Sequence, residues 1–289
     1  MTTERVGLVL SCEGMGDCLF AMAVIRKLNH AGAFVFDLFT QHPALFKACP
    51  YLGGEVRSLR DPKLERYPNR IVRLFELEKL PYWGMDTFDF ISLPLGIGQL
   101  SFREKQLDYF PVEEDRAEQF DVVLNTSTTW KTRTWPLEHW QRLADALLAR
   151  GLTVAVVGKD VESRTDKMVK RSPVLERVRN LVNQQSLDQA YFTIRKCGLF
   201  VSCQNGLSVV AGATDVEMVV LGTSVEWSKR AIYRQDSPLH KITYVKGGCP
   251  VYCGADNECP LPENQGTFPC VPDYAQVEAA VLARLPVPA

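Results

Sequence analysis

Residues 120–157 read FDVVLNTSTTWKTRTWPLEHWQRLADALLARGLTVAVV and contain one complete strand–helix–strand unit. Residues 121–124 and 152–157 are short, mostly apolar runs, typical of strands buried on both faces of a sheet. Between them Pro136 stands at the start of a run with helical spacing, and Gly151 ends it. Two strands joined in this way predict a parallel sheet with a right-handed crossover.

The same pattern occurs at the start of the chain. Residues 6–10 form an apolar run, a glycine-containing turn ends at Asp17, and a helical pattern leads to a second predicted strand at 34–39. Further along, strands at 199–202 and 216–221 alternate with predicted helices. Ser186 and Asp273 are the expected N-caps of two helices, and a third begins at Gly206. The stretch from about 50 to 115 is interrupted by six prolines, and residues 88–93 are its candidate strand.

Strands and helices therefore alternate twice over, with a break near residues 110–120. We predict an α/β protein with two Rossmann-like domains, residues 1–115 and 116–289, whose parallel sheets face one another across a cleft. Ligands of such sheets bind beyond the carboxyl ends of the strands.

The composition limits the class of protein. The chain has 289 residues, 46% of them hydrophobic and 23% charged, with a formal net charge of −1. This excludes a disordered chain, and no apolar run approaches the ~18 residues of a membrane span. The charge balance disfavours nucleic acid as a partner, although a local basic patch stays open. The first five residues lack the layout of a signal peptide, so a cytoplasmic location is expected.

Four of the nine cysteines fall near the C-terminus with the spacing C-x3-C-x5-C-x10-C. Their positions are Cys249, Cys253, Cys259 and Cys270. Four thiolates at this spacing suit a tetrahedral structural zinc or iron; the alternative is reduced cysteines in an irregular loop, or disulfides formed after lysis. The five scattered cysteines are expected to be small core residues.

Two turns and one acidic residue carry the chemistry that the sequence indicates. Asp17 is expected at a helix N-terminus, either as an N-cap or as a base facing the cleft. The turn at residues 125–136 combines hydroxyls, two cations and a helix start, which favours an anion. At residues 202–208 the backbone N–H groups of Gly206 and Leu207 are expected to point at an anion. A dinucleotide fingerprint is disfavoured, because Leu19 replaces its third glycine.

Three stretches together resemble glycosyltransferase family 9, the heptosyltransferases that use ADP-heptose. They are Gly14–Asp17, the Arg-Thr-Trp-Pro block at 133–140, and residues 202–211 followed by 219–222. The resemblance implies a GT-B fold and an inverting glycosyltransferase whose chemistry needs no cofactor. Asp17 falls on the family's catalytic aspartate. The residues implied in donor binding are Gly16, Thr128, Thr129, Lys131, Arg133, Gln204, Asn205, Gly206 and Leu207.

Some positions depart from the family. Gln204 stands in place of an acid and Val209 in place of a histidine, and both groups contact the sugar and phosphate in the family. The cysteine cluster is similar to that of the autotransporter heptosyltransferases, a branch that carries a cysteine-bound iron. The implied partners are an ADP-linked or other nucleotide-diphosphate sugar and a saccharide, lipid-saccharide or protein acceptor. The alternatives are a catalytically silent nucleotide-sugar-binding protein, and a transferase acting on a modified nucleobase.

Overall fold

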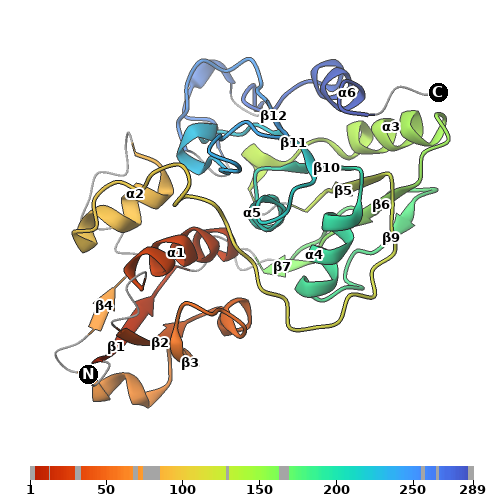
Figure 1. Ribbon diagram of the computed structural model, residues 1–289. Coiled ribbons are helices and arrows are strands. Elements are labelled where there is room, and N and C mark those ends of the chain that lie inside the picture. The colour runs from red at the N-terminus through yellow and green to blue at the C-terminus, as the bar shows by residue number, and fades with distance from the viewer. Residues whose placement is uncertain are drawn as a thin grey trace. The chain divides into compact units, whose positions relative to one another are not determined.

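The computed structural model describes residues 4–12, 14–29, 34–67, 71–73, 85–127, 130–162, 169–254, 258–264 and 267–285. The chain forms two compact units (Figure 1). Unit 1 comprises Met1–Val112 and Ser228–His240, and unit 2 comprises Glu113–Trp227 and Lys241–Ala289. The first boundary lies close to the expected one. The segment Ser228–His240, expected in the second domain, instead groups with unit 1.

Unit 1 is built on a parallel sheet with the strand order β3-β2-β1-β4. Its strands are β1 (Glu4–Leu10), β2 (Phe34–Thr40), β3 (Gly53–Ser58) and β4 (Ile71–Arg73). The chain starts at β1, adds β2 and β3 on one side, and returns to add β4 on the other. The carboxyl end of β1 is therefore the switch point of this sheet, where open α/β sheets bind their ligands.

The helices of unit 1 pack tightly in its interior. Helix α1 (Met15–Leu28) leaves the switch point, and its residues 18–25 are all buried. Residues 88–93, the candidate strand, lie in helix α2 (Thr87–Ser92) and the short turn after it, so the strand interpretation is wrong. The side chain of Asp86 accepts a hydrogen bond from the Asp89 N–H at 2.9 Å and caps α2. A short apolar run marks burial, but it does not by itself distinguish a strand from a buried helix.

Unit 2 is built on a larger parallel sheet with the order β12-β11-β10-β5-β6-β9. Its strands are β5 (Val122–Asn125), β6 (Val154–Val157), β9 (Arg179–Asn180), β10 (Leu199–Cys203), β11 (Glu217–Leu221) and β12 (Ile242–Val245). The chain runs outward from β5 to β9 and then returns to place β10 on the other side of β5. The switch point therefore lies between β5 and β10, at their carboxyl ends.

Helices cover both faces of this sheet (Figure 1). They are α3 (Leu137–Leu148), α4 (Leu187–Lys196), α5 (Gly206–Gly212) and α6 (Tyr274–Leu282). Helices α3 and α6 share one hydrophobic core with the inward side chains of the strands, and Trp135 and Trp140 pack edge to face within it. The expected caps are confirmed: Ser186 accepts from the Gln189 N–H and Asp273 from the Gln276 N–H. A two-stranded antiparallel hairpin, β7 (Val161–Glu162) and β8 (Val169–Lys170), completes the unit.

Short 3-10 turns connect these elements. They are η1 (Pro43–Phe46), η2 (Pro62–Arg66), η3 (Leu93–Leu95), η4 (Lys131–Arg133), η5 (Trp227–Arg230) and η6 (Pro262–Asn264). Among the helices that the structure describes, none combines the length and the apolar character needed to cross a membrane.

Candidate functional site

The turn after β1 brings Asp17 to the switch point of unit 1. Gly14 is the N-cap of α1 and Asp17 is the third residue of the helix, so the N-cap interpretation of Asp17 is wrong. A carboxylate in the first helical turn is favoured by the helix dipole. Gly14 leaves room for this carboxylate, because a Cβ built on Gly14 would lie 2.5 Å from Asp17 Oδ2.

Asp17 forms an ion pair with Arg230, a residue that the sequence analysis missed. Arg230 Nη1 donates a hydrogen bond to Asp17 Oδ1. Both side chains are mostly covered, since 14% of the Asp17 side chain and 22% of the Arg230 side chain are exposed. Arg230 lies in the part of the chain that returns to unit 1, and its only sequence signal is a pair of adjacent cations, Lys229 and Arg230.

The turn after β5 brings Arg133 to the switch point of unit 2. The guanidinium carbon of Arg133 lies 3.7 Å from the centre of the Trp130 ring, and Arg133 Nη1 donates to the carbonyl oxygen of Gln204 at 3.2 Å. This second contact joins the turns after β5 and β10. Lys131, in the same 3-10 turn as Arg133, is exposed. The expected hydroxyl pair Thr128 and Thr129 lies outside the described residues.

The turn after β10 presents a buried amide. Gln204 is 6% exposed, and its Oε1 accepts a hydrogen bond from Thr223 Oγ1 at 3.0 Å. No group in the described part of the chain lies within hydrogen-bond reach of Gln204 Nε2. A buried N–H without a partner costs free energy, so this N–H is available as a hydrogen-bond donor.

Asn205 organises the start of α5. Its Oδ1 accepts from the N–H groups of Leu207 at 3.0 Å and Ser208 at 3.2 Å, and its Nδ2 donates to the Ser127 carbonyl at 2.8 Å. Asn205 is therefore a cap and a link to the turn after β5. The Leu207 N–H, expected to point at an anion, is committed to Asn205 instead. Gly206 is the first residue of α5 and keeps its place at the helix N-terminus.

These residues of unit 2 form a site with the chemistry of anion binding. Arg133 supplies a guanidinium, which suits phosphate oxygens because its donors form a planar fork. The Gln204 side chain supplies a neutral N–H, and the Gln204 backbone carbonyl accepts a hydrogen bond from Arg133. Both groups lie at the switch point between β5 and β10, where α/β sheets of this order bind nucleotides.

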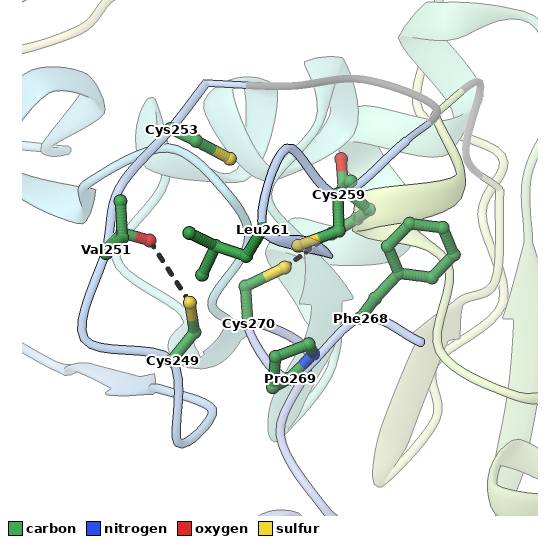
Figure 2. Close-up of a pocket in the computed structure, with 9 residues that line it drawn as sticks. Cys249, Val251, Cys253, Cys259, Leu261, Phe268, Pro269 and Cys270 are labelled. Atoms are coloured by element: carbon green, nitrogen blue, oxygen red, sulfur yellow. Dashed lines mark hydrogen bonds between the residues drawn. The ribbon is translucent and has the colours of Figure 1, made fainter. Parts of the chain in front are cut away.

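The four C-terminal cysteines line one small cavity (Figure 2). It has a volume of about 10 Å³, and its other walls include Val251, Leu261, Phe268 and Pro269. Burial, together with the other three thiols, raises the pKa of Cys270 to about 11. Within the described ranges no group of three or more His, Cys, Asp or Glu side chains is arranged to hold a metal ion.

Thr132 connects this cavity to the turn after β5. It lines the cavity, and its carbonyl oxygen lies 4.0 Å from Cys270 Sγ as a hydrogen-bond acceptor. Thr132 is also the residue before Arg133. The other five cysteines, Cys12, Cys18, Cys49, Cys197 and Cys203, are buried free thiols, as the sequence predicts.

Comparison with known sequences identifies a family. Residues 59–228, more than half of the chain, match the sequence profile of glycosyltransferase family 9 (heptosyltransferase). No curated protein sequence matches the chain.

Several solved structures share the fold. The glycosyl transferase family 9 protein from Veillonella parvula DSM 2008 is 11% identical to this chain, with a TM-score of 0.70. The structural alignment covers 99% of the present chain and 98% of the Veillonella protein. The iron-containing dodecameric glycosyltransferase TibC from enterotoxigenic E. coli H10407 is 14% identical over 98% of this chain and 76% of that chain, with a TM-score of 0.74. TibC, described as a heptosyltransferase, is also solved with ADP-D-beta-D-heptose.

The E. coli ADP-heptose LPS heptosyltransferase II is 16% identical, covers 97% of this chain and 98% of that chain, and has a TM-score of 0.59. At these identities the likeness is one of fold. The predicted fold class is confirmed: the α/β architecture with parallel sheets is that of the GT-B structures of family 9.

Proposed function

Because the chain belongs to glycosyltransferase family 9 and is a glycosyltransferase, we propose that it transfers a heptose or a related sugar from an ADP-linked donor to an acceptor hydroxyl. The single observation that carries this proposal is that the switch point of unit 2 combines two donors: Arg133, whose guanidinium is bonded to the backbone carbonyl of Gln204, and the side-chain Nε2 of Gln204, which has no partner among the described residues. The complex of TibC with ADP-D-beta-D-heptose supports the choice of donor.

In this proposal unit 2 holds the donor. Arg133 binds an oxygen of the diphosphate and stabilises the charge that develops as the nucleoside diphosphate leaves. Gln204 donates its amide N–H to the donor, and Asn205 and Gly206 shape the turn beneath it. Thr128, Thr129 and Lys131, together with Gly16 of unit 1, stay as predicted donor-binding residues, whereas the Leu207 N–H is already engaged by Asn205.

In this proposal Asp17 of unit 1 is the general base. Its carboxylate takes the proton from the acceptor hydroxyl while the acceptor oxygen forms a bond to the anomeric carbon of the donor. The bond between that carbon and the diphosphate oxygen breaks, and ADP leaves with both electrons. Attack from the face opposite the leaving group inverts the anomeric centre. Asp17 Oδ2 is suited to this role, since Oδ1 is engaged by Arg230.

The acceptor in this proposal is a saccharide, a lipid-linked saccharide or a protein. A silent nucleotide-sugar-binding protein is the second candidate, because Gln204 and Val209 replace an acid and a histidine of the family. Val209 is 6% exposed and apolar, so it offers no polar group to a sugar. The neutral amide of Gln204 still offers a donor to a phosphate or hydroxyl oxygen, which favours turnover with an altered preference for the sugar.

A transfer assay separates these candidates. The full-length chain is incubated with ADP-heptose, UDP-glucose or GDP-mannose, each with a lipopolysaccharide core saccharide or an acceptor polypeptide, and release of the nucleoside diphosphate is measured. We expect release that is fastest with the ADP-linked sugar. Binding of ADP-heptose in calorimetry without release under any condition would establish the silent protein, and absence of both binding and release would overturn the proposal.

We also propose that Cys249, Cys253, Cys259 and Cys270 hold a structural zinc or iron. All four line one cavity whose remaining walls are largely apolar, and thiolates are the donors that these metals prefer. A site with four protein ligands is closed to substrate, so the metal would stabilise the loop and take no part in transfer. The iron-containing TibC supports this assignment.

Elemental analysis of the purified chain tests the metal site. About one zinc or iron per chain is expected, and Cys259→Ser is expected to lower both the metal content and the melting temperature. Cys49→Ala changes a buried thiol in unit 1 and is the matched control, with unchanged metal content. A metal-free wild-type chain with the melting temperature of a metal-reconstituted sample would contradict the site.

A further inference from the structure

The segment Ser228–His240 inserts into unit 1 although the chain on both sides of it belongs to unit 2. Its central residues are buried, with exposed fractions of 1% to 7%: Ala231, Ile232, Tyr233 and Arg234. A segment buried to this degree is part of the interior of the unit and not a surface loop. Arg230, the partner of Asp17, directly precedes these residues.

Helix α2 fixes this segment at two points. Thr87 Oγ1 donates a hydrogen bond to the carbonyl oxygen of Lys229 at 2.8 Å, one residue before Arg230. The Tyr233 ring packs against Phe88 with its centroid 5.7 Å away, and its hydroxyl donates to Asp86 Oδ2 at 3.2 Å. Residues 86–88 therefore hold the backbone just before Arg230 and the side chain of Tyr233 just after it.

A buried charge network in turn fixes the start of α2. Lys105 Nζ lies 2.5 Å from Asp86 Oδ2 and 2.8 Å from Asp89 Oδ2, and all three side chains are at least nine-tenths covered. Lys105 Nζ also lies 5.4 Å from the centre of the Tyr233 ring. Removing one partner of a buried pair leaves an uncompensated charge, so this network resists distortion.

The same helix α2 packs against α1 close to Asp17. Phe20 and Phe88 meet edge to face with their ring centres 4.8 Å apart. Phe20 is three residues after Asp17, so the two side chains lie on the same side of α1. The segment that carries Arg230 and the helix that carries Asp17 are thus attached to one common element.

We propose that Arg230 is a positioning residue, which fixes the Asp17 carboxylate in the orientation needed for proton transfer. This inference rests on the proposed role of Asp17 as the base. The guanidinium binds Oδ1, and the open space at Gly14 receives Oδ2. A charge-assisted hydrogen bond is strong and directional, so it restricts the rotation of the carboxylate and leaves one oxygen for the acceptor proton.

The test compares Arg230→Gln and Arg230→Lys with the wild-type chain in the transfer assay. We expect Arg230→Gln to lower kcat about 10- to 100-fold, since misplacement by about 1 Å costs up to 10²-fold, while KM for the nucleotide sugar stays within twofold. Arg230→Lys is expected to restore part of kcat because it keeps the charge. Arg103→Gln changes an exposed arginine of unit 1 and is the control with wild-type kcat.

A double-mutant cycle with Asp17→Asn separates the two proposals. If Arg230 acts through Asp17, the loss from Arg230→Gln largely disappears in the Asp17→Asn background. If Asp17→Asn is inactive and Arg230→Gln has wild-type kcat, the positioning role of Arg230 is overturned, but the role of Asp17 as the base is retained. A fully active Asp17→Asn would instead overturn the base itself. Equal losses from Arg230→Gln in both backgrounds, or a loss wholly in donor KM, would also overturn the positioning role.

Discussion

The turns after β1 and β5 occupy the same topological position in two different sheets, and they carry opposite charges. Each follows the strand from which its sheet grows outward in both directions. The turn after β1 presents the carboxylate of Asp17, and the turn after β5 presents the guanidinium of Arg133. The same topological position, used once in each sheet, thus carries an acidic group in unit 1 and a basic group in unit 2.

The two turns also differ in how their charged groups are held. Arg133 is held by a ring three residues before it and by a backbone carbonyl of the neighbouring strand's turn. Asp17 is held by Arg230, which is 213 residues away in the sequence. Arg133 thus has one contact within its own turn and one to a residue 71 positions away, whereas the ion pair of Asp17 depends on the docking of a more distant segment.

The largest expected effect is on catalysis through the turn after β1. Asp17→Asn removes the proposed proton acceptor, and we expect kcat to fall about 10²- to 10⁴-fold, the usual contribution of a general base. Affinity for ADP should stay within twofold, because in the proposed mechanism Arg133, and not Asp17, binds the diphosphate. Steady-state kinetics and calorimetry measure the two quantities. Asp236→Asn, at an exposed position of unit 1, is the control and should keep wild-type kcat. If Asp17→Asn lowers the affinity for ADP as much as it lowers kcat, the two turns do not have separate roles.

The next effect is on donor affinity through the turn after β5. Arg133→Met keeps the length of the side chain but removes its charge, and a charge-assisted hydrogen bond contributes about 1.5–3 kcal/mol. We therefore expect the Kd for ADP in calorimetry to rise about 10- to 100-fold, with Arg133→Lys in between. Arg116→Met at an exposed position of unit 2 should bind as the wild type does. Unchanged affinity in Arg133→Met would remove this residue from the diphosphate site.

A smaller effect is expected at Gly14. The Cβ of Gly14→Ala would clash with Asp17 Oδ2, which is the end of a side chain that is able to move. We therefore expect the fold to tolerate the substitution and the Asp17 carboxylate to be displaced. We expect kcat to fall about tenfold, and the free energy of unfolding to fall by about 0.5–1 kcal/mol, because alanine is a poorer N-cap than glycine. Gly96→Ala is unsuitable as a control because of its positive φ, so Gly248→Ala, with open space at its Cβ, is the better match. Wild-type kcat in Gly14→Ala would show that the position of Oδ2 is unimportant.

The smallest effect is on stability at the turn after β10. Asn205→Ala removes the cap of α5 and its link to Ser127, and loss of such a cap costs about 1 kcal/mol. Chemical denaturation should show this loss. Because Asn205 and Arg133 belong to the same unit, ADP should recover part of it by binding to the folded state. A destabilisation that ADP leaves unchanged at saturation would argue against a donor site next to Asn205.

Local patterns in the sequence predict most of the sheet architecture. Residues 120–157 contain their own strand, helix and second strand, and the structure has all three. The caps at Ser186 and Asp273 act within three residues and were predicted for the same reason. The residues at the two switch points could be found because they directly follow recognisable strands.

Features that depend on distant residues could not be predicted in this way. The hydrogen bond from Thr87 to Lys229 spans 142 residues, and no local periodicity indicates it. Residues 88–93 were considered a strand because a buried run of six residues fits either structure. The sequence leaves Asp17 as either an N-cap or a base, and no local signal indicates its pairing with Arg230, 213 residues away.

The return of Ser228–His240 to unit 1 has a consequence for the synthesis of this protein. A ribosome releases Met1–Val112 first, yet the interior of that unit still lacks the four residues from Ala231 to Arg234. Nascent chains generally fold domain by domain from the N-terminus, but here the interior of unit 1 is complete only after most of unit 2 has been translated. A truncated translation product that ends before Arg230 therefore contains Asp17 without its ion-pair partner, and we expect such a product to lack transferase activity.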